Sequence, residues 1–315
     1  METALKLEHV YKRIGKREIL HDINLETYAG EVFGFLGPNG AGKTTTIKMI
    51  VGLLSTDEGK IEVAGYDIRK NFEKAMRNIG GIVENPEMYP TLTGMQNLQQ
   101  YARMRYGVTQ KRIQEVVELV GLSNRIQDKV KKYSLGMRQR LGVAQAILHH
   151  PKVLILDEPT NGLDPAGIKD LRDILKNLAH KENISVMVSS HLMSEMEMMC
   201  DRVGIIVRGK VIGVQTVEEM IDSAMGGKHR FVFQVNDPQK AALELSQRNC
   251  QEIKHMEENC LEISLPQENP KEQIADILEA MVRAGIRVYR VSPIERKSLE
   301  DVFLELTEEE GKQIG

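Results

Sequence analysis

The sequence predicts an α/β fold built on a parallel sheet, followed by a second, smaller α+β domain. Three observations support this prediction. A glycine-rich loop at 37–44 lies between a short apolar strand, 31–36, and a buried helix, 44–54. Four consecutive apolar residues at 153–156 precede two carboxylates, which is typical of a strand covered on both faces of a parallel sheet. Beyond about residue 216 the pattern changes to short strands that alternate with two helices.

The glycine-rich loop matches the phosphate-loop pattern G-x-x-x-x-G-K-[ST] with these residues: Gly37, Pro38, Asn39, Gly40, Ala41, Gly42, Lys43 and Thr44. Glycines let backbone N–H groups approach a polyphosphate, which the positive end of the following helix also attracts. We expect Lys43 to reach the β- and γ-phosphates and the Thr44 hydroxyl to complete the shell of Mg²⁺, with Thr45 beside it. An ordinary glycine-rich turn is the alternative. The lysine, the threonine and the flanking strand and helix favour a nucleoside triphosphate site.

Asp157 and Glu158 directly follow the apolar run, so they would emerge at the carboxyl end of its strand. Open α/β sheets place their chemistry at that end. We expect Asp157 to hold Mg²⁺, directly or through water, and Glu158 to polarise the water that attacks the γ-phosphate. A surface pair of carboxylates is usually only solvated charge. The buried strand before this pair favours the catalytic interpretation.

Composition and charge narrow the class of protein. The chain has 315 residues, of which 41% are hydrophobic and 28% charged, as in ordinary globular proteins. A net charge of −3, 4% aromatic residues and no tryptophan argue against a nucleic-acid partner. Cys200, Cys250 and Cys260 lack the spacing of a metal site and are expected to be reduced thiols. No apolar run approaches the roughly 18 residues of a membrane span, and we expect no signal peptide at the N-terminus.

A capped helix lies between the two sites. Ser134 is a good N-cap, and the apolar residues that follow recur at helical spacing: Leu141, Ala144, Ile147 and Leu148. Taken alone, this is an ordinary amphipathic helix. Its place between the phosphate loop and the carboxylates, and the segments 161–165 and 189–191 that follow, give it a functional interpretation.

With every motif in this order, the stretch 5–215 resembles the nucleotide-binding subunit of an ATP-binding-cassette (ABC) transporter. The resemblance implies a P-loop NTPase fold of the ABC ATPase type with an inserted helical subdomain at about 90–150. It also identifies 134–139 as a variant of the family's signature sequence, which closes over ATP held by a second subunit. The ATP-binding residues that this implies are Ser134, Gly136 and Met137.

The resemblance assigns roles to three further residues. Asp164 matches the loop that couples the two sites across a dimer. His191 matches the histidine that hydrogen-bonds the γ-phosphate and positions the attacking water, although a lone histidine is more often a satisfied core residue. Tyr11 matches the aromatic residue that stacks on adenine, and from the sequence alone it could equally be a core tyrosine.

The chain also departs from the family pattern. Glu84 stands where the family usually has a glutamine that senses Mg²⁺ and touches the membrane partner, so we expect Glu84 at the ATP and metal site. Leu135 and Met137 differ from the signature consensus. The residues at 84–86, 92–93 and 133–137 resemble those typical of the bacitracin-resistance and lantibiotic-immunity branch of the family. This branch pairs such subunits with membrane proteins of the ABC-2 type.

The domain prediction has four parts. Residues 1–218 form the ABC ATP-binding domain, 219–228 a linker, 229–306 a small α+β domain and 307–315 a charged tail. The small domain resembles the C-terminal extension of ABC-2-type export ATPases. Its own residues show no catalytic constellation.

The motifs predict an ATPase that binds ATP and Mg²⁺. The resemblance implies that it dimerises on ATP, as a homodimer or close heterodimer, and powers a separate ABC-2-type permease. The resemblance implies export of a peptide antibiotic or other amphiphile, with the chain cytoplasmic and peripheral on the inner face of the membrane. A soluble ABC ATPase acting on ribosomes or DNA is one alternative, which the single cassette, the lack of heptads and the net charge disfavour. A nucleotide sensor without hydrolysis is another, and the presence of Glu158 and His191 disfavours it.

Overall fold

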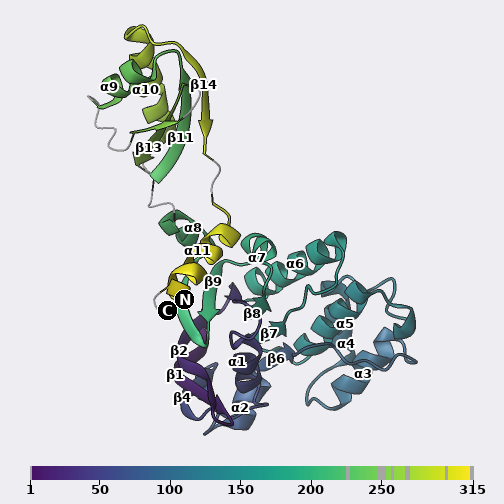
Figure 1. Cartoon of the computed structure of the whole chain (residues 1–315). Coiled ribbons are helices and arrows are strands. Elements are labelled where there is room, and N and C mark those ends of the chain that lie inside the picture. The colour runs from purple at the N-terminus through teal and green to yellow at the C-terminus, as the bar shows by residue number, and fades with distance from the viewer. Residues whose placement is uncertain are drawn as a thin grey trace. The chain divides into compact units, whose positions relative to one another are not determined.

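The chain forms two compact units, residues 1–217 and 218–315 (Figure 1). The computed structural model describes residues 2–224, 228–246, 253–256, 259–266, 270–294 and 297–312. Within these ranges no helix is both long and apolar enough to span a bilayer.

A six-stranded sheet forms the centre of the first unit. Its order is β10 (Lys210–Thr216), β9 (Arg202–Val207), β3 (Val32–Leu36), β8 (Ser185–Ser190), β7 (Val153–Asp157) and β6 (Ile79–Ile82). All neighbours pair in parallel except β10, which is antiparallel to β9. Every residue of β3, β7 and β8 is buried, because these central strands are covered on both faces. Their polar carboxyl ends therefore meet along one edge of the sheet.

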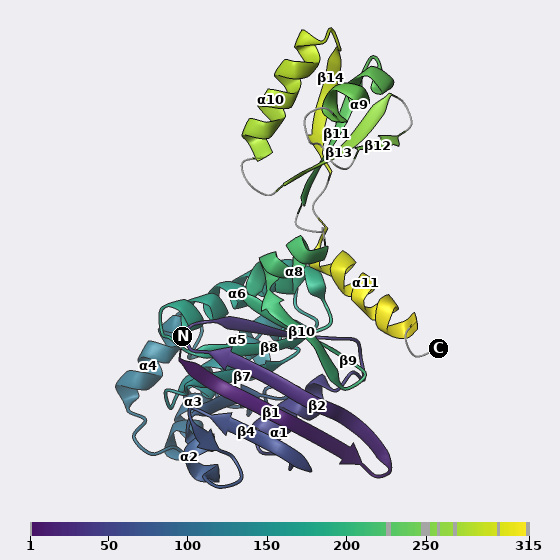
Figure 2. The same cartoon turned by 90° about the vertical axis from the view of Figure 1, so that its left-hand side faces the viewer.

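A four-stranded antiparallel sheet forms a second layer of this unit (Figure 2). Its order is β2 (Arg17–Tyr28), β1 (Thr3–Ile14), β4 (Glu58–Val63) and β5 (Tyr66–Asp67). Helix α1 (Lys43–Ile50) shares one hydrophobic core with both sheets, including Leu7, Phe35 and Ile47. Because α1 packs in this core, its first residue and the phosphate loop before it are held in place relative to the two sheets.

The segment between β6 and β7 is helical and lies on one side of the unit (Figure 1). It contains α3 (Gly94–Arg103), α4 (Gln110–Leu119), the 3₁₀ turn Val130–Lys132 and α5 (Leu135–Ile147). The expected helical stretch 96–124 is thus two helices, and Gly107 adopts a left-handed φ of 82° in the turn between them. The remaining helices of the unit are α2 (Phe72–Arg77), α6 (Pro165–His180) and α7 (Met193–Met199).

The second unit contains a βαββαβ arrangement. Its elements are β11 (Lys228–Val235), α9 (Pro238–Ser246), β12 (Ile253–Met256), β13 (Cys260–Pro266), α10 (Pro270–Arg283) and β14 (Val288–Pro293). The sheet order β12-β13-β11-β14 is antiparallel throughout, as in ferredoxin-like split βαβ folds. Phe233, Leu261 and Met281 lie in its core.

Helices also occupy part of the expected linker and tail. Residues Val217–Ala224 form α8, within the stretch interpreted as linker, and 225–227 lie outside the described residues. Helix α11 (Leu299–Lys312) continues into the expected tail, of which 313–315 lie outside the described residues. Cys250 also lies outside them.

Candidate nucleotide site

The phosphate loop connects β3 to α1 and is held from two sides. A Cβ added to Gly37 would lie 2.3 Å from the carbonyl oxygen of Ile206, so no side chain fits there. Gly42 has a φ of 115°, and a Cβ on it would lie 2.5 Å from Leu20. The amide of Gly209 donates to the Ala41 carbonyl over 2.9 Å. The glycine pattern therefore corresponds to real steric constraints.

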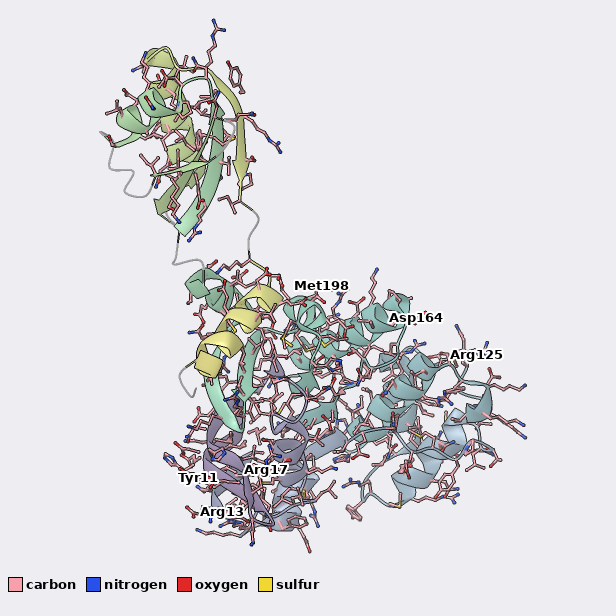
Figure 3. The ribbon with its side chains drawn as sticks, in the orientation of Figure 1. Tyr11, Arg13, Arg17, Arg125, Asp164 and Met198 are labelled. Atoms are coloured by element: carbon pink, nitrogen blue, oxygen red, sulfur yellow. The ribbon has the colours of Figure 1, made fainter. Side chains whose placement is uncertain are left out.

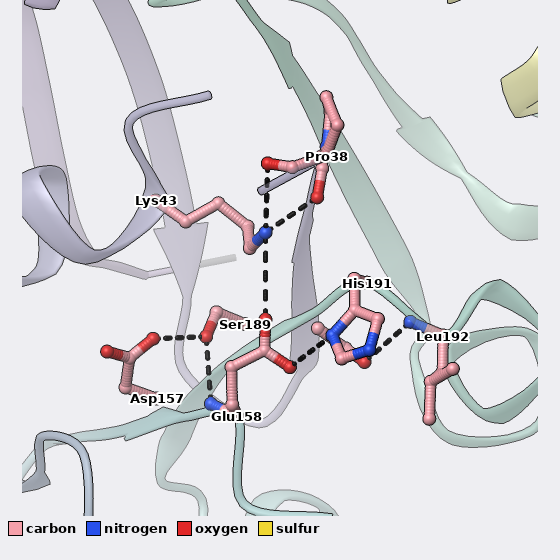
Figure 4. Close-up of polar contacts among 9 residues, drawn as sticks. Pro38, Lys43, Asp157, Glu158, Ser189, His191 and Leu192 are labelled. Atoms are coloured by element: carbon pink, nitrogen blue, oxygen red, sulfur yellow. Dashed lines mark hydrogen bonds and ion pairs between the residues drawn. The ribbon is translucent and has the colours of Figure 1, made fainter. Parts of the chain in front are cut away.

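Lys43 is buried beneath this loop, with 6% of its surface exposed. Its Nζ donates to the carbonyl of Gly37 over 2.6 Å and to that of Pro38 over 3.3 Å. It also lies 3.6 Å from Oε1 of Glu158 (Figure 4). Burial lowers the pKa of Lys43, and the Glu158 carboxylate opposes that shift. A buried cation is thus held next to the place where phosphates would lie.

The two predicted carboxylates meet a serine of the neighbouring strand. Asp157 ends β7 and is in register with Ser189 of β8. The hydroxyl of Ser189 donates to Oδ1 of Asp157 over 2.6 Å and accepts from the amide of Glu158 over 2.9 Å. Ser189 is fully buried. One buried hydroxyl therefore fixes both the side chain of Asp157 and the backbone of Glu158 (Figure 4).

His191 completes a line of polar side chains. Its Nδ1 lies 2.9 Å from Oε2 of Glu158, whose other oxygen faces Lys43. Glu158 adopts a left-handed φ of 49°, which is uncommon for a residue other than glycine and marks a constrained position. The structure thus brings together Lys43, Asp157, Glu158 and His191, which the sequence placed in three separate segments.

Lys43, Glu158 and His191 line a cavity of about 860 Å³, and the buried Asp157 is not part of its lining. Its lining includes the following residues: Ile14, Arg17, Glu18, Ile19, His21, Pro38, Asn39, Gly40, Ala41, Gly42, Lys43, Thr44, Thr45, Glu158, Asn161, His191 and Arg208. The volume is within the range of small-molecule sites. Ser189 was missed as a site residue, although it belongs to the segment 189–191 that the sequence singled out.

The donor set fits Mg²⁺ bound together with phosphates. Among the described residues no group of three or more His, Cys, Asp or Glu side chains could hold a metal ion by itself. Mg²⁺ in nucleotide sites usually needs only one or two protein oxygens, because phosphates and water supply the other ligands. The Thr44 hydroxyl and the Asp157 carboxylate are oxygen donors of this kind.

Two predicted ligands lie elsewhere. Tyr11 is not among the residues that line the cavity. Its backbone pairs with Glu58 of β4. Burial, together with the charge of Asp22, raises the pKa of the Tyr11 hydroxyl. The structure therefore does not bring Tyr11 to the cavity, where Ile14 lies instead. Glu84 is also absent from the lining, and its carboxylate lies 2.9 Å from Nζ of Lys48.

The signature residues lie together at the starts of two helices. Ser134 caps α5 by accepting from the Met137 amide over 3.2 Å, and Asp164 caps α6 by accepting from the Gly167 amide over 3.1 Å. Gly136 packs beside Gly167, because a Cβ added to Gly136 would lie 3.9 Å from the Cα of Gly167. None of these residues lines the cavity, and Figure 3 places Asp164 and Arg17 on different sides of the unit.

Comparison with known proteins identifies the family. The family model for the ABC transporter matches residues 20–161. The ABC transporter ATP-binding protein YhcH of Bacillus subtilis (strain 168) is 52% identical over 314 residues, which cover 100% of this chain and 99% of YhcH. The chain belongs to the ABC transporter ATP-binding family. Its fold is that of a P-loop ABC ATPase, and members of this family bind and hydrolyse ATP for transport.

Other relatives agree with this assignment. The bacitracin transport ATP-binding protein BcrA of Bacillus licheniformis is 39% identical to this ABC ATPase, and the match covers 97% of this chain and 98% of BcrA. A solved structure of an ATP-binding subunit of an ABC transporter superposes with a TM-score of 0.63 at 29% identity, covering 71% of this chain and 94% of that one. Relatives of this ABC ATPase thus include antibiotic transport and resistance subunits.

Proposed function

We propose that this chain binds MgATP in the cavity under the phosphate loop, hydrolyses it, and powers a separate ABC-2-type permease. The convergence of Lys43, Asp157, Glu158 and His191 carries the proposal, because each supplies a different requirement of phosphoryl transfer. Lys43 stabilises charge on the β- and γ-phosphates. Glu158 accepts a proton from the attacking water, while His191 positions that water and contacts the γ-phosphate.

Mg²⁺, held by Thr44 and Asp157, would neutralise phosphate charge and orient the oxygens. Ser189 keeps the Asp157 carboxylate in place, since its hydroxyl donates to Oδ1 over 2.6 Å. The phosphate-loop amides and the N-terminus of α1 bind the remaining oxygens. The chain's own contribution is therefore orientation and charge complementarity around the triphosphate.

The site is completed in a dimer. Ser134, Gly136, Met137 and Asp164 are grouped at two helix N-termini that do not line the chain's own cavity. Helix N-termini attract anions, so this face of a second subunit would close over the γ-phosphate. ATP then links two copies, or this chain and a close relative, because each site needs residues from both.

The transported molecule follows from the relatives alone. Relatives named for bacitracin transport, linearmycin resistance and lantibiotic transport support export of a peptide antibiotic or another amphiphile. The chain would lie on the cytoplasmic face of the membrane through its permease. Glu84 and the following residues to 93 would contact that permease.

Steady-state phosphate release tests the catalytic assignment. The variant Glu158→Gln removes the base and the charge that faces Lys43, so the rate should fall at least about 100-fold while ATP binding persists. Glu118→Gln is the matched control, because Glu118 is an exposed glutamate on α4. An unchanged rate in Glu158→Gln would contradict the catalytic assignment of Glu158, whereas no phosphate release by the unmodified chain would favour a sensor without hydrolysis.

Capture from gently solubilised membranes tests the transport assignment. A stoichiometric polytopic membrane protein recovered with the chain supports it. Recovery with ribosomes or DNA, or of the chain alone, would contradict transport and leave the ATPase site intact.

A further inference from the structure

Three exposed lysines lie close together at the 3₁₀ turn between α4 and α5. Lys129, Lys131 and Lys132 are all exposed, and we call these three residues the lysine turn. Val130 and Tyr133 of the same stretch are buried. Their burial attaches the backbone firmly to the helical segment, so the three lysine side chains are left to project into solvent.

The charge of the lysine turn is not compensated within the part of the chain that the structure describes. None of its three ammonium groups makes a hydrogen bond or an ion pair there. The preceding carboxylate, Asp128, is taken by Arg125, whose Nε lies 2.7 Å from its Oδ2. Figure 3 places Arg125 and Arg17 on different sides of the unit, and the lysine turn does not line the nucleotide cavity. Positive charge is therefore concentrated at a second place, although the net charge of the chain is −3.

Backbone hydrogen bonds join the lysine turn to the segment 89–93, which we propose contacts the permease. The amide of Val130 donates to the carbonyl of Leu92, and the amide of Lys131 donates to the carbonyl of Pro90, each over 2.9 Å. The turn and this segment therefore form one continuous surface. A surface that adjoins the contact with a membrane protein lies next to the bilayer around that protein.

An exposed tyrosine extends this surface. Tyr89 is 57% exposed, although its backbone is held by the fully buried Asn97. Oδ1 of Asn97 accepts from the Tyr89 amide over 2.8 Å, and Nδ2 donates to the Tyr89 carbonyl over 3.1 Å. A fixed backbone thus presents an aromatic ring to solvent. Tyrosine is favoured at the level of lipid headgroups, because its ring is apolar and its hydroxyl is polar.

We propose that the lysine turn and Tyr89 bind anionic phospholipid headgroups of the membrane around the permease. The headgroup phosphates supply the negative charge that the three ammonium groups lack within the described chain. Each lysine near an anionic membrane surface should strengthen binding about fivefold. This inference rests on the proposed function, since contact with a permease is what places the surface at a bilayer.

Sedimentation with lipid vesicles, in the absence of ATP and permease, tests this contact directly. The probes are vesicles of phosphatidylglycerol, which is anionic, and of phosphatidylcholine, which has no net charge. The unmodified chain should bind the anionic vesicles about 100-fold more strongly at low salt, and about 0.5 M salt should remove most of this difference by screening. The combined variant Lys129→Gln, Lys131→Gln and Lys132→Gln should reduce binding to the level seen with phosphatidylcholine. Arginine at the same three positions should preserve binding, because the charge is kept.

A second triple variant controls for net charge. Lys16→Gln, Lys152→Gln and Lys181→Gln remove three exposed lysines elsewhere and lower the net charge by the same amount. This variant should keep its affinity for the anionic vesicles within about threefold, because distant charges are screened. Tyr89→Ser should weaken binding at low and high salt alike, since the contact of its ring is not electrostatic.

Three results would overturn the inference. Equal weakening by the two triple variants would show that net charge alone governs binding. Failure of the unmodified chain to bind phosphatidylglycerol vesicles would exclude the lipid contact and leave the ATPase and permease assignments intact, because neither ATP nor permease is present. Lost capture of the permease by the variant at the lysine turn, with unchanged vesicle binding, would assign the lysines to the permease instead.

Discussion

Ser189 offers the sharpest test of how the carboxylates are held. Its hydroxyl joins Asp157 at 2.6 Å to the amide of Glu158 at 2.9 Å, and all three groups lie at the carboxyl ends of buried strands. The variant Ser189→Ala removes both contacts and only one heavy atom. We expect this change to lower turnover while ATP binding is maintained, because the phosphate loop and Lys43 are untouched.

The magnitude follows from the two lost hydrogen bonds. A hydrogen bond to a charged group contributes about 1.5–3 kcal/mol, and one to a neutral amide about 1 kcal/mol. Ser189→Ala should therefore lower the free energy of unfolding by about 2.5–4 kcal/mol. Misplacement of a catalytic group by about 1 Å can cost about 100-fold in rate. We thus expect the turnover number to fall about 10- to 100-fold, with a higher Mg²⁺ concentration for half-maximal activity.

Ser185→Ala is the matched control for this prediction. Ser185 is equally buried on the same strand, and its hydroxyl lies 2.8 Å from that of Thr27, away from the carboxylates. This variant should lose about 0.5–1.5 kcal/mol of stability and keep its turnover number. The assay is phosphate release against Mg²⁺ concentration, with urea unfolding of both variants. Equal turnover in Ser189→Ala and Ser185→Ala would refute the positioning role.

Three further predictions concern the site and its support. Lys43→Ala should lower ATP affinity at least about 100-fold in calorimetry without unfolding the chain, and retained tight binding would contradict the phosphate-loop assignment. Thr93→Ala should cost about 1 kcal/mol in urea unfolding, because Thr93 and Gln96 form a reciprocal capping box at α3. Burial lowers the pKa of His149, so its neutral form stabilises the chain fully above pH 6.5 and this contribution is lost as the pH falls. His149→Gln should therefore reduce the loss of unfolding free energy between pH 7.5 and 5.5, and an unchanged loss would exclude this source.

Much of the site was predictable because its chemistry follows short local patterns. The glycine spacing fixed the phosphate loop, and the apolar run before Asp157 fixed the strand that ends there. The place of His191 in the site depends on its contact with Glu158, which no local sequence pattern predicts. The role of His191 was therefore predicted only from the family resemblance. Ser189 was missed because its role depends on strand register: β8 places it beside Asp157, 32 residues away in the sequence.

Strand β1 shows why the alternation of side chains along a strand can mislead a prediction from sequence. Strand β1 is irregular, with register shifts against β2 between Leu7 and Val10, and again between Lys12 and Arg13. A β-bulge changes which face the following side chains occupy. Counting from the start of the strand therefore does not place Tyr11 or Ile14. Only the paired structure shows that Ile14, and not Tyr11, lines the cavity.

ATP binding is expected to change the contact between Lys43 and Glu158. Nζ of Lys43 is shared between two loop carbonyls and a carboxylate 3.6 Å away, so its charge is compensated within the chain. A γ-phosphate competes for that same cation, and its negative charge repels the carboxylate. Arrival of the nucleotide would therefore transfer Lys43 to the phosphates and leave Glu158 paired only with His191. If Glu158 is the general base, as we propose, the substrate would itself release it from Lys43 and leave His191 as its partner.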